Sequence, residues 1–397
     1  MKNAFNKTVI ALFLLFIIFS IISYSRGYRF NFTDKKISST GILAISSSPK
    51  AAKVYINGKL KGVTDLNLTL KPATYAIEVK KEGYMPFKTT VALKGEIVET
   101  IDPLLFPNNP SLSPLSNLGI IKAVRINQSD KIVLISENDN DKDGIYLFDS
   151  SSKPITIFTP LKVLILKEKF PLFLTLKNSE IVFSPDYKQF VLTLYSQDKT
   201  LSKSYLISTE TENQELFDVT DSKETLIDAW DKEKTKEIQK ILETYPKEIQ
   251  KIASSSLQIL SMSPDQTKIL YKPTKDLNIP FIIKPPLIAS NQTKESRNIS
   301  SKNIYVYDKK EDKNFKIEDS LTNENDLIWY SDSKRLVFKE NEKISIAHYD
   351  GTNKQVIYSG PLDEDFFSVN ADGKLLILTN LNPKTNILPD LYIVGIR

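Results

Sequence analysis

The chain has 397 residues, 41% hydrophobic and 25% charged, which is enough for two or three folded domains. It contains no cysteine, which excludes disulfides, thiolate catalysis, cysteine-based zinc sites and a lipid anchor carried on cysteine. The formal net charge of +5 arises within residues 1–36, where one acid opposes six bases: Lys2, Lys7, Arg26, Arg29, Lys35 and Lys36. The remainder is neutral overall, so we expect no nucleic-acid partner, which would need a concentrated basic face.

Residues 8–24 are almost wholly apolar. As a helix rising about 1.5 Å per residue they would span about 26 Å, close to the thickness of a bilayer core. Two interpretations fit: a retained anchor, or a signal peptide cleaved after Ser23-Tyr24-Ser25. We favour the anchor, because Ser25 is a poor cleavage residue and Arg26 follows it directly. We therefore expect residues 1–36 to hold a single-pass signal-anchor and its linker, with a cytoplasmic N-terminus and extracytoplasmic domains.

Residues 37–107 predict a small β-sandwich, because short runs alternate between apolar and polar side chains. Asn57-Gly58 is the strongest hairpin-turn signal in this region. Its residues occur in the order Ile45, Ser47, Pro49, Ala52, Val54, Ile56-Asn57-Gly58, Gly62, Thr64, Leu70, Tyr75, Ile77, Val79 and Gly83-Tyr84. This order resembles a PEGA domain, although Pro72-Ala73-Thr74 departs from the family's usual Pro-Gly. The resemblance implies a small β-sandwich of cell-surface and envelope proteins, without known catalytic residues.

Residues 108–397 contain a recurring phrase in which a Ser/Pro/Asp turn is followed at once by an apolar strand. Its turn aspartates are Asp130, Asp186, Asp265, Asp332 and Asp372. Further strands follow in each repeat, including a fourth and outermost strand expected at 155–158 in the first. Four antiparallel strands per repeat predict propeller blades. The pattern resembles TolB-type, WD-repeat-like propellers, and it indicates five blades, or six if residues 163–166 and 173–176 belong to another.

The last repeat offers three strands, so ring closure needs a fourth strand from elsewhere. We expect Leu104–Phe106, or a strand soon after, to supply it. Two insertions interrupt the repeats. Residues 229–252 have apolar side chains at helical spacing, interrupted by Pro246, which predicts a kinked helix or two short helices. They either pack on the rim of the ring or dock a partner. Residues 273–298 are too rich in proline for a central strand and form either a recognition surface or a loop lying flat on its own domain.

Asp139, Asp141 and Asp143 are the candidate metal ligands. They begin a calcium-type loop, in which oxygen ligands at alternate positions converge on a hard cation. The twelfth position, which should be acidic, is Ser150, so we favour a charged hairpin between two strands and keep calcium binding as the alternative. We predict no other cofactor and no catalytic residues.

Other chemistry has weak support in the sequence. His348 precedes a turn and is expected to be structural, and no nucleophile elbow accompanies it. The acids 363–365 are expected to form a solvated loop, and Trp230 and Trp329 to pack in the core or rim.

The expected fold is mainly β: an N-terminal transmembrane helix, a PEGA-like sandwich and a β-propeller with a helical insertion. We expect a non-enzymatic, membrane-anchored binding or scaffold protein of the cell envelope, whose propeller recognises a protein or a cell-wall glycan. This function rests on analogy of fold. Two alternatives remain open: a component of an envelope transport or assembly complex resembling TolB-type propellers, and a carboxylate-based hydrolase or lyase.

Overall fold

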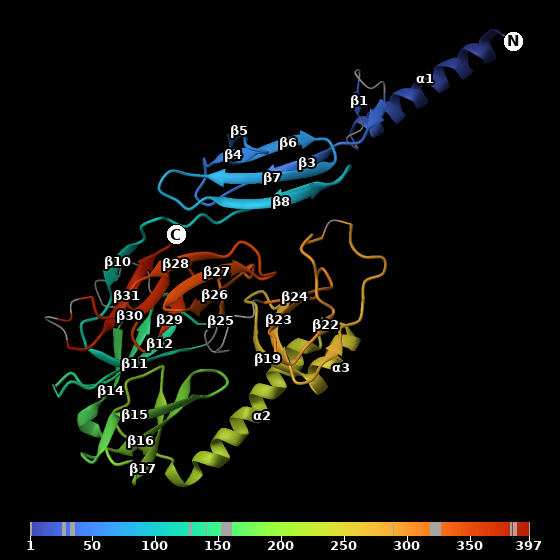
Figure 1. Cartoon of the computed structure of the whole chain (residues 1–397). Helices are drawn as coiled ribbons and strands as arrows, with labels where there is room; N and C mark the ends of the chain where they lie inside the picture. The colour runs from blue at the N-terminus through green and yellow to red at the C-terminus, as the bar shows by residue number, and fades with distance from the viewer. Residues whose placement is uncertain are drawn as a thin grey trace. The chain divides into compact units, whose positions relative to one another are not determined.

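The computed structural model describes residues 2–396 except 26–28, 32–35, 127–128, 140, 152–160, 289, 318–326, 382 and 384–386. The fold is mainly β (Figure 1). The chain divides into two compact units. The first comprises Met1–Asn109 and Pro285–Thr293, and the second comprises Pro110–Lys284 and Lys294–Arg397.

The first unit begins with helix α1 (Lys2–Ser25), followed by the short hairpin of β1 (Arg29–Asn31) and β2 (Lys36–Ser38). The large apolar side chains of α1 from Val9 to Ile22 are exposed. Within the described residues, we find no helix whose length and apolar character together suffice to cross a membrane.

Two sheets then form a sandwich. One has the order β6 (Leu66–Leu70), β3 (Gly41–Ile45), β9 (Val98–Ile101), with β9 parallel to β3. The other has the order β5 (Lys59–Val63), β4 (Lys53–Ile56), β7 (Ala73–Lys80), β8 (Phe87–Leu93). The core between them includes Leu43, Val54, Ile77, Val79 and Leu105. The predicted hairpin turn is confirmed: Asn57 and Gly58 both have positive φ, and the Asn57 side chain accepts a hydrogen bond from the Ala76 amide at 2.9 Å.

The second unit is a ring of five four-stranded antiparallel sheets, each a propeller blade. The five blades are listed from the innermost to the outermost strand. Blade 1 contains β11 (Ile120–Arg125), β12 (Lys131–Ser136), β13 (Gly144–Asp149) and β14 (Leu161–Leu166). Blade 2 contains β15 (Leu174–Phe183), β16 (Gln189–Ser196), β17 (Ser202–Ser208) and β18 (Phe217–Asp218). Blade 3 contains β19 (Leu257–Met262), β20 (Lys268–Pro273), β23 (Tyr305–Asp308) and β24 (Lys313–Lys316). Blade 4 contains β25 (Leu327–Trp329), β26 (Arg335–Glu340), β27 (Lys343–His348) and β28 (Gln355–Ser359). Blade 5 contains β29 (Phe367–Val369), β30 (Leu375–Thr379), β31 (Asp390–Gly395) and β10 (Ser111–Pro114).

The hypothesis of a sixth blade at 163–176 is wrong for the described residues. Residues 161–166 are β14, the outer strand of blade 1, and residues 174–176 begin β15, the inner strand of blade 2. The fourth strand expected at 155–158 lies outside the described residues.

Of the two closing strands expected from the sequence, the structure confirms the second, a strand soon after Phe106. Strand β10 pairs antiparallel with β31, with Leu112 opposite Val394 and Ser113 opposite Ile393. Leu104–Phe106 instead belongs to the first unit, where Leu105 is part of the sandwich core. The first and last strands of the ring therefore complete one blade together, and β31 is paired on both sides.

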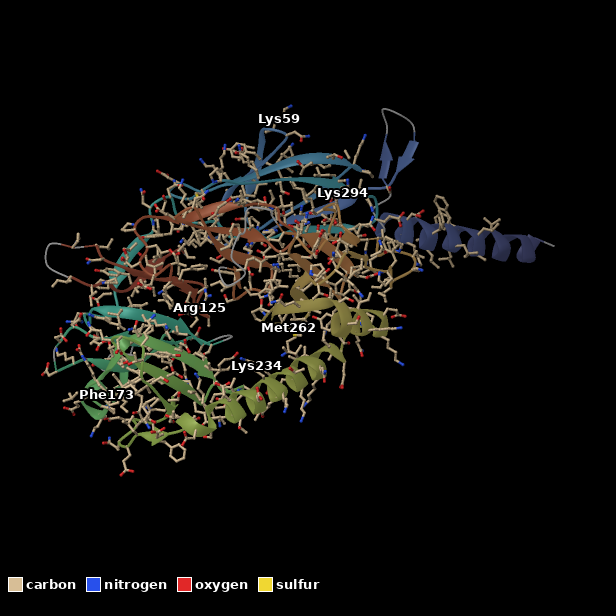
Figure 2. The ribbon with its side chains drawn as sticks, turned by 60° about the horizontal axis from the view of Figure 1, so that its bottom comes forward. Lys59, Arg125, Phe173, Lys234, Met262 and Lys294 are labelled. Carbon is tan, nitrogen blue, oxygen red and sulfur yellow. The ribbon has the colours of Figure 1, made fainter. Side chains whose placement is uncertain are left out.

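The helical insertion forms two helices on either side of Pro246, as its sequence predicts: α2 (Lys223–Leu242) and α3 (Lys247–Ser256). Trp230 of α2 packs on Val182 and Val191 of blade 2, and Ile249 and Ala253 of α3 belong to the core cluster of blade 3. Helix α2 thus runs from blade 2 to blade 3 (Figures 1 and 2). Helices α2 and α3 lie between blades 2 and 3. Blades 1 and 2 pack directly against each other, and so do blades 3 and 4.

The second insertion leaves blade 3 through the two-residue strands β21 (Leu277–Asn278) and β22 (Asn298–Ile299). A buried ion pair fixes its base: Arg297 Nη1 lies 3.1 Å from Asp312 Oδ1, and Asp312 Oδ2 accepts the amides of Ile282 and Ile283. Residues 285–293 belong to the first unit, where the Gln292 side chain bonds both backbone groups of Ala92. We expected this loop either to lie flat on its own domain or to form a recognition surface. Only the base of the loop lies on its own domain, the propeller.

Candidate functional site

The antiparallel topology separates the connections of the ring into two faces. The turn face holds the Ser/Asp turn after the first strand of each blade and the connection after the third strand. The loop face holds the connection after each second strand, at 137–143, 197–201, 274–304, 341–342 and 380–389, and the passages between blades at 167–173, 219–256 and 360–366. The three stretches singled out from the sequence, 139–144, 229–252 and 273–298, belong to connections of the loop face. The helices also reach the turn face, and so does the second insertion, which bonds Asp312 there.

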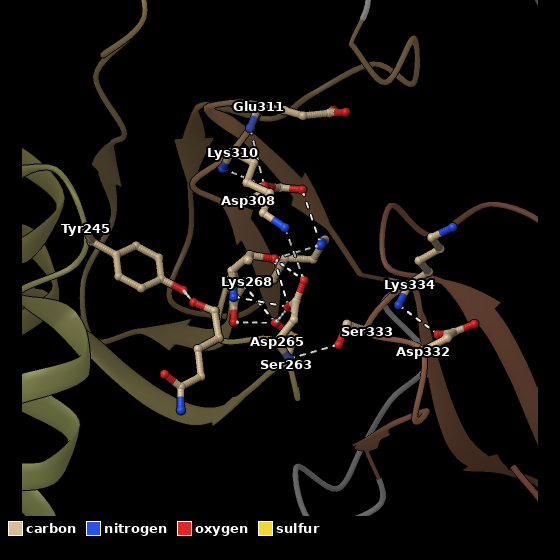
Figure 3. Close-up of polar contacts among 12 residues, drawn as sticks. Tyr245, Ser263, Asp265, Lys268, Asp308, Lys310, Glu311, Asp332, Ser333 and Lys334 are labelled. Atoms are coloured by element: carbon tan, nitrogen blue, oxygen red, sulfur yellow. Dashed lines mark hydrogen bonds and ion pairs between the residues drawn. The ribbon is translucent and has the colours of Figure 1, made fainter. Parts of the chain in front are cut away.

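The turn face is built from hydrogen bonds of the repeated phrase. In blade 3, Asp265 accepts bonds from the Ser263 hydroxyl at 2.7 Å and the Thr267 hydroxyl at 2.9 Å (Figure 3). Burial alone raises the pKa of Asp265, but these bonds and nearby Lys268 outweigh it and hold the pKa well below its usual range. In blade 2, the Ser184 hydroxyl bonds Asp186 at 2.7 Å and lowers its pKa in the same way. The turn carboxylates therefore serve as acceptors.

The same turns also join neighbouring blades. The Asp265 amide donates to the Ser333 hydroxyl of blade 4 at 3.0 Å (Figure 3). Tyr330 of blade 4 donates to the Gly373 carbonyl of blade 5 at 2.9 Å, and the Ala371 amide donates to Asp130 of blade 1 at 2.6 Å. At the helical insertion, Tyr245 donates to the Gln266 carbonyl of blade 3 at 3.0 Å. The repeated phrase thus joins blade 3 to blade 4, blade 4 to blade 5 and blade 5 to blade 1.

The loop face carries most of the exposed large apolar side chains of the ring: Leu172 (102% exposed), Phe173 (50%), Leu201 (57%), Leu381 (44%) and Ile387 (95%). Outside this face, Phe217 and Val356 are exposed on outer strands. Leu172, Phe173 and Leu201 lie at the same end of blade 2, because Leu174 pairs with Ser196 and the Ser196 amide bonds the Leu201 carbonyl at 2.9 Å. Phe173 lies on the outer side of this blade (Figure 2). We call Leu172, Phe173 and Leu201 the blade-2 tip.

The predicted calcium ligands have distinct surroundings. Asp143 is buried, and its two oxygens accept the backbone amides of Asn138 at 2.7 Å and Asp139 at 2.8 Å. The Asp139 carboxylate is 93% exposed, Asp141 is exposed, and Asn140 lies outside the described residues. The described residues contain no group of three or more His, Cys, Asp or Glu side chains placed to hold a metal ion. Asp143 orders its own hairpin, and calcium binding stays a prediction.

Sequence reasoning missed a buried acid beside this loop. Glu137 lies 2.7 Å from Lys167 Nζ and accepts bonds from the Thr175 hydroxyl at 2.7 Å and the Lys177 amide at 2.8 Å. Burial raises its pKa, but the bonds from Lys167, Thr175 and Lys177 outweigh it and leave the pKa lowered. Glu137 thereby links blade 1 to blade 2. The available signal was a charged residue placed directly after the apolar strand 132–136.

The other residues singled out from the sequence take part in packing, hydrogen bonds or ion pairs of the propeller. Burial, aided by Arg335, lowers the pKa of His348 to about 4, so its imidazole is neutral at pH 7. Asp363 accepts the Asn380 amide at 2.8 Å, and Asp365 forms an ion pair with Lys339. Trp230 is buried between α2 and blade 2, and Trp329 packs against the cluster shared by blades 3 and 4.

Comparisons with known proteins identify one matching family and several solved structures of low similarity. Residues 40–105 match the model of the PEGA domain. No curated protein matches the chain. Similar solved structures include an oligogalacturonate lyase from Vibrio parahaemolyticus (10% identity, 73% of this chain, 97% of that one, TM-score 0.28). Others are a putative TolB from Agrobacterium tumefaciens (11%, 78% and 89%, 0.17) and the propeller of the Trilobed protease from Pyrococcus furiosus (17%, 81% and 79%, 0.16).

TM-scores this low carry no argument, so the assignment of the ring rests on its own strand order. The chain thus contains a PEGA domain at residues 40–105, followed by a five-bladed β-propeller.

Proposed function

We propose that this protein is a membrane-anchored, extracytoplasmic binding protein whose loop face recognises a partner protein. The observation that carries the proposal is that most of the exposed large apolar side chains of the ring lie on the loop face, three of them at the blade-2 tip. Exposed apolar side chains that lie close together mark interaction sites, and aromatic anchors contribute much of the binding free energy at interfaces.

The proposed anchor is the apolar segment 8–24. Its support is the helical conformation of α1 and the exposure of its large apolar side chains from Val9 to Ile22. Burial of these side chains in lipid would remove a large apolar area from water. The PEGA match at residues 40–105 supports an extracytoplasmic position for the domains that follow, because this family occurs in cell-surface and envelope proteins.

Four carboxyl groups of the ring have lowered pKa values, which suits hydrogen-bond acceptors and not general acids. Hydrogen bonds from Thr220, together with Lys203, lower the pKa of Asp218 to about 2. The pKa values of Asp186, Asp265 and Glu137 are lowered as well. A general acid working near neutral pH requires a raised carboxyl pKa, and a general base such as histidine requires a pKa near 7. These groups instead serve the hydrogen bonds that hold the blades.

Site-directed photo-crosslinking in intact envelopes tests this proposal. A photoreactive phenylalanine analogue replaces Phe173 in one chain and the exposed Phe217 of the outer strand β18 in the matched control. We expect one discrete protein adduct from position 173 and none from position 217. No adduct at 173, or the same adducts at both positions, would contradict the proposal, and adducts containing only wall glycan would replace the protein partner by a glycan.

A further inference from the structure

The sandwich has two outward faces of different character. On the β5-β4-β7-β8 sheet, the outward positions are those that alternate with the buried Val54, Val79 and Phe87. They bear the lysines Lys53, Lys80 and Lys88, one acid, Glu78, and the apolar or aromatic side chains Tyr55, Leu60 and Val63. We call this surface the lysine face. The outward face of the other sheet bears Ile42, Ala44, Asn67, Thr69, Val98 and Thr100, and therefore no charge.

The lysine face holds more positive charge than its own acid neutralises. Glu78 lies 2.9 Å from Lys80 and 3.4 Å from Lys88, so its negative charge is shared between them. Lys53 stands directly opposite Lys80 in the register of β4 and β7. Like charges directly opposite each other destabilise a sheet. An anionic surface placed over this face would relieve that repulsion.

The apolar side chains of the same face indicate what kind of anionic surface fits. Leu60 (57% exposed) and Val63 (51%) lie in the rows of Tyr55 and Lys53, and Lys80 lies over the Tyr55 ring at 5.3 Å. Lysines beside exposed leucine and valine match a lipid surface, where phosphate groups border acyl chains. Lys59 and Lys61 on the edge strand β5 add charge of the same sign, and Lys59 is marked in Figure 2. The chain between the proposed anchor and the sandwich is basic as well, with Arg26, Arg29, Lys35 and Lys36 against Asp34.

We propose that the lysine face docks on the surface of an anionic lipid membrane, with its lysines against the phosphate groups. The proposal rests on the proposed anchor, which would keep the sandwich within reach of the bilayer. A lysine close to an anionic membrane contributes on the order of 1 kcal/mol, which corresponds to about a fivefold change in the ratio of docked to undocked molecules.

The absence of cysteine makes a single-label test possible in the full chain. Thr90→Cys places a fluorophore on the lysine face, and Thr69→Cys places the same fluorophore on the uncharged face. Each chain is reconstituted into vesicles of phosphatidylcholine, alone or mixed with phosphatidylglycerol, that contain a quencher in the headgroup region. We expect quenching at position 90 only with phosphatidylglycerol, its loss at high salt, and no quenching at position 69.

Lysine-to-glutamine substitutions test whether the lysine face makes the contact with the membrane. Lys80→Gln should lower the docked-to-undocked ratio about fivefold, and Lys53→Gln/Lys80→Gln/Lys88→Gln should abolish quenching at position 90. Lys71→Gln, which precedes the opposite end of β7, is the matched control and should leave quenching unchanged. Thermal melting of each variant confirms that the sandwich is folded.

The outcomes separate the two proposals. If the chain floats with neither kind of vesicle, both the anchor and the docking face are wrong. If it floats with both kinds but the label at position 90 is never quenched, the docking face alone is wrong. Shielding of that label by a soluble acidic polysaccharide, and not by anionic lipid, would replace the lipid with a glycan and overturn the proposal.

Discussion

The two faces of the propeller use their side chains differently. On the turn face, Ser, Thr and Asp side chains bond within the turns of blades 2 and 3, and Asp265, Ser333 and Tyr330 join one blade to the next. On the loop face, leucine and phenylalanine side chains such as Leu172 and Phe173 are exposed to solvent. The repeated phrase thus contributes to the stability of the ring, whereas the proposed function belongs to the connections that do not repeat. Substitutions on the two faces should therefore have opposite consequences.

The largest expected effect is loss of the ring itself. Removal of residues 392–397 takes most of β31, which pairs with β30 on one side and β10 on the other. We expect the whole ring to lose cooperative thermal unfolding, because a ring without closure exposes two blade edges. Circular dichroism melting measures this. A variant in which only one blade is lost and the others melt as before would contradict cooperative closure.

Next in size is the buried ion pair at the base of the blade-3 insertion. Asp312→Ala removes one of the two carboxylates that pair with the buried Arg297 guanidinium, the other being that of Glu295 at 2.7 Å, and it frees the amides of Ile282 and Ile283. Because Glu295 remains, we expect a loss of about 3 kcal/mol of unfolding free energy, the lower end for a broken buried pair. Urea denaturation measures the loss. The exposed pair of Lys203 and Asp218 is the matched control, and Asp218→Ala should cost much less.

The pH dependence of stability should come first from His348, the only histidine in the chain. Its pKa is about 4 in the folded state, below the ordinary 6.5, so protons favour the unfolded state. The stability that this group contributes is complete above pH 6.5 and is lost as the pH falls toward 4, by on the order of 3 kcal/mol. Melting curves from pH 7 to 4 check it. His348→Gln should remove this slope, and an unchanged slope would assign it elsewhere.

Single turns on the turn face should have smaller effects. Asp265→Ala removes the acceptor of Ser263 and Thr267, and we expect a loss of about 1–2 kcal/mol. Because the folded pKa of Asp265 is lowered, its contribution is present above the ordinary range of aspartate and is lost at lower pH. Asp265→Asn should reduce the acid sensitivity of melting in that range. Equal acid sensitivity in both chains would show that the turn carboxylate is not charged in the folded state.

The hairpins and the repeated turns were predictable from the sequence, because the residues that specify a turn are adjacent in the chain. Asn57-Gly58 and the Ser-Pro-Asp turns specify their own backbone, so hairpins and blades were predicted from a few adjacent residues. The number of blades was not, because whether residues 161–166 end one blade or begin another depends on their pairing with β13. The Arg297–Asp312 and Glu137–Lys167 pairs were missed for the same reason: their partners are brought together only by the fold.

The most direct test measures stability and partner capture together for one variant of each face. Leu172→Ser/Phe173→Ser alters the blade-2 tip, and Asp265→Asn alters a turn. We expect the tip variant to keep its unfolding free energy within about 0.5 kcal/mol and to lose crosslinking from a photoreactive group at position 201. The turn variant should lose stability and, below its melting temperature, keep crosslinking from the same position. A tip variant that captures its partner as well as the unaltered chain would contradict the assignment of function to the loop face.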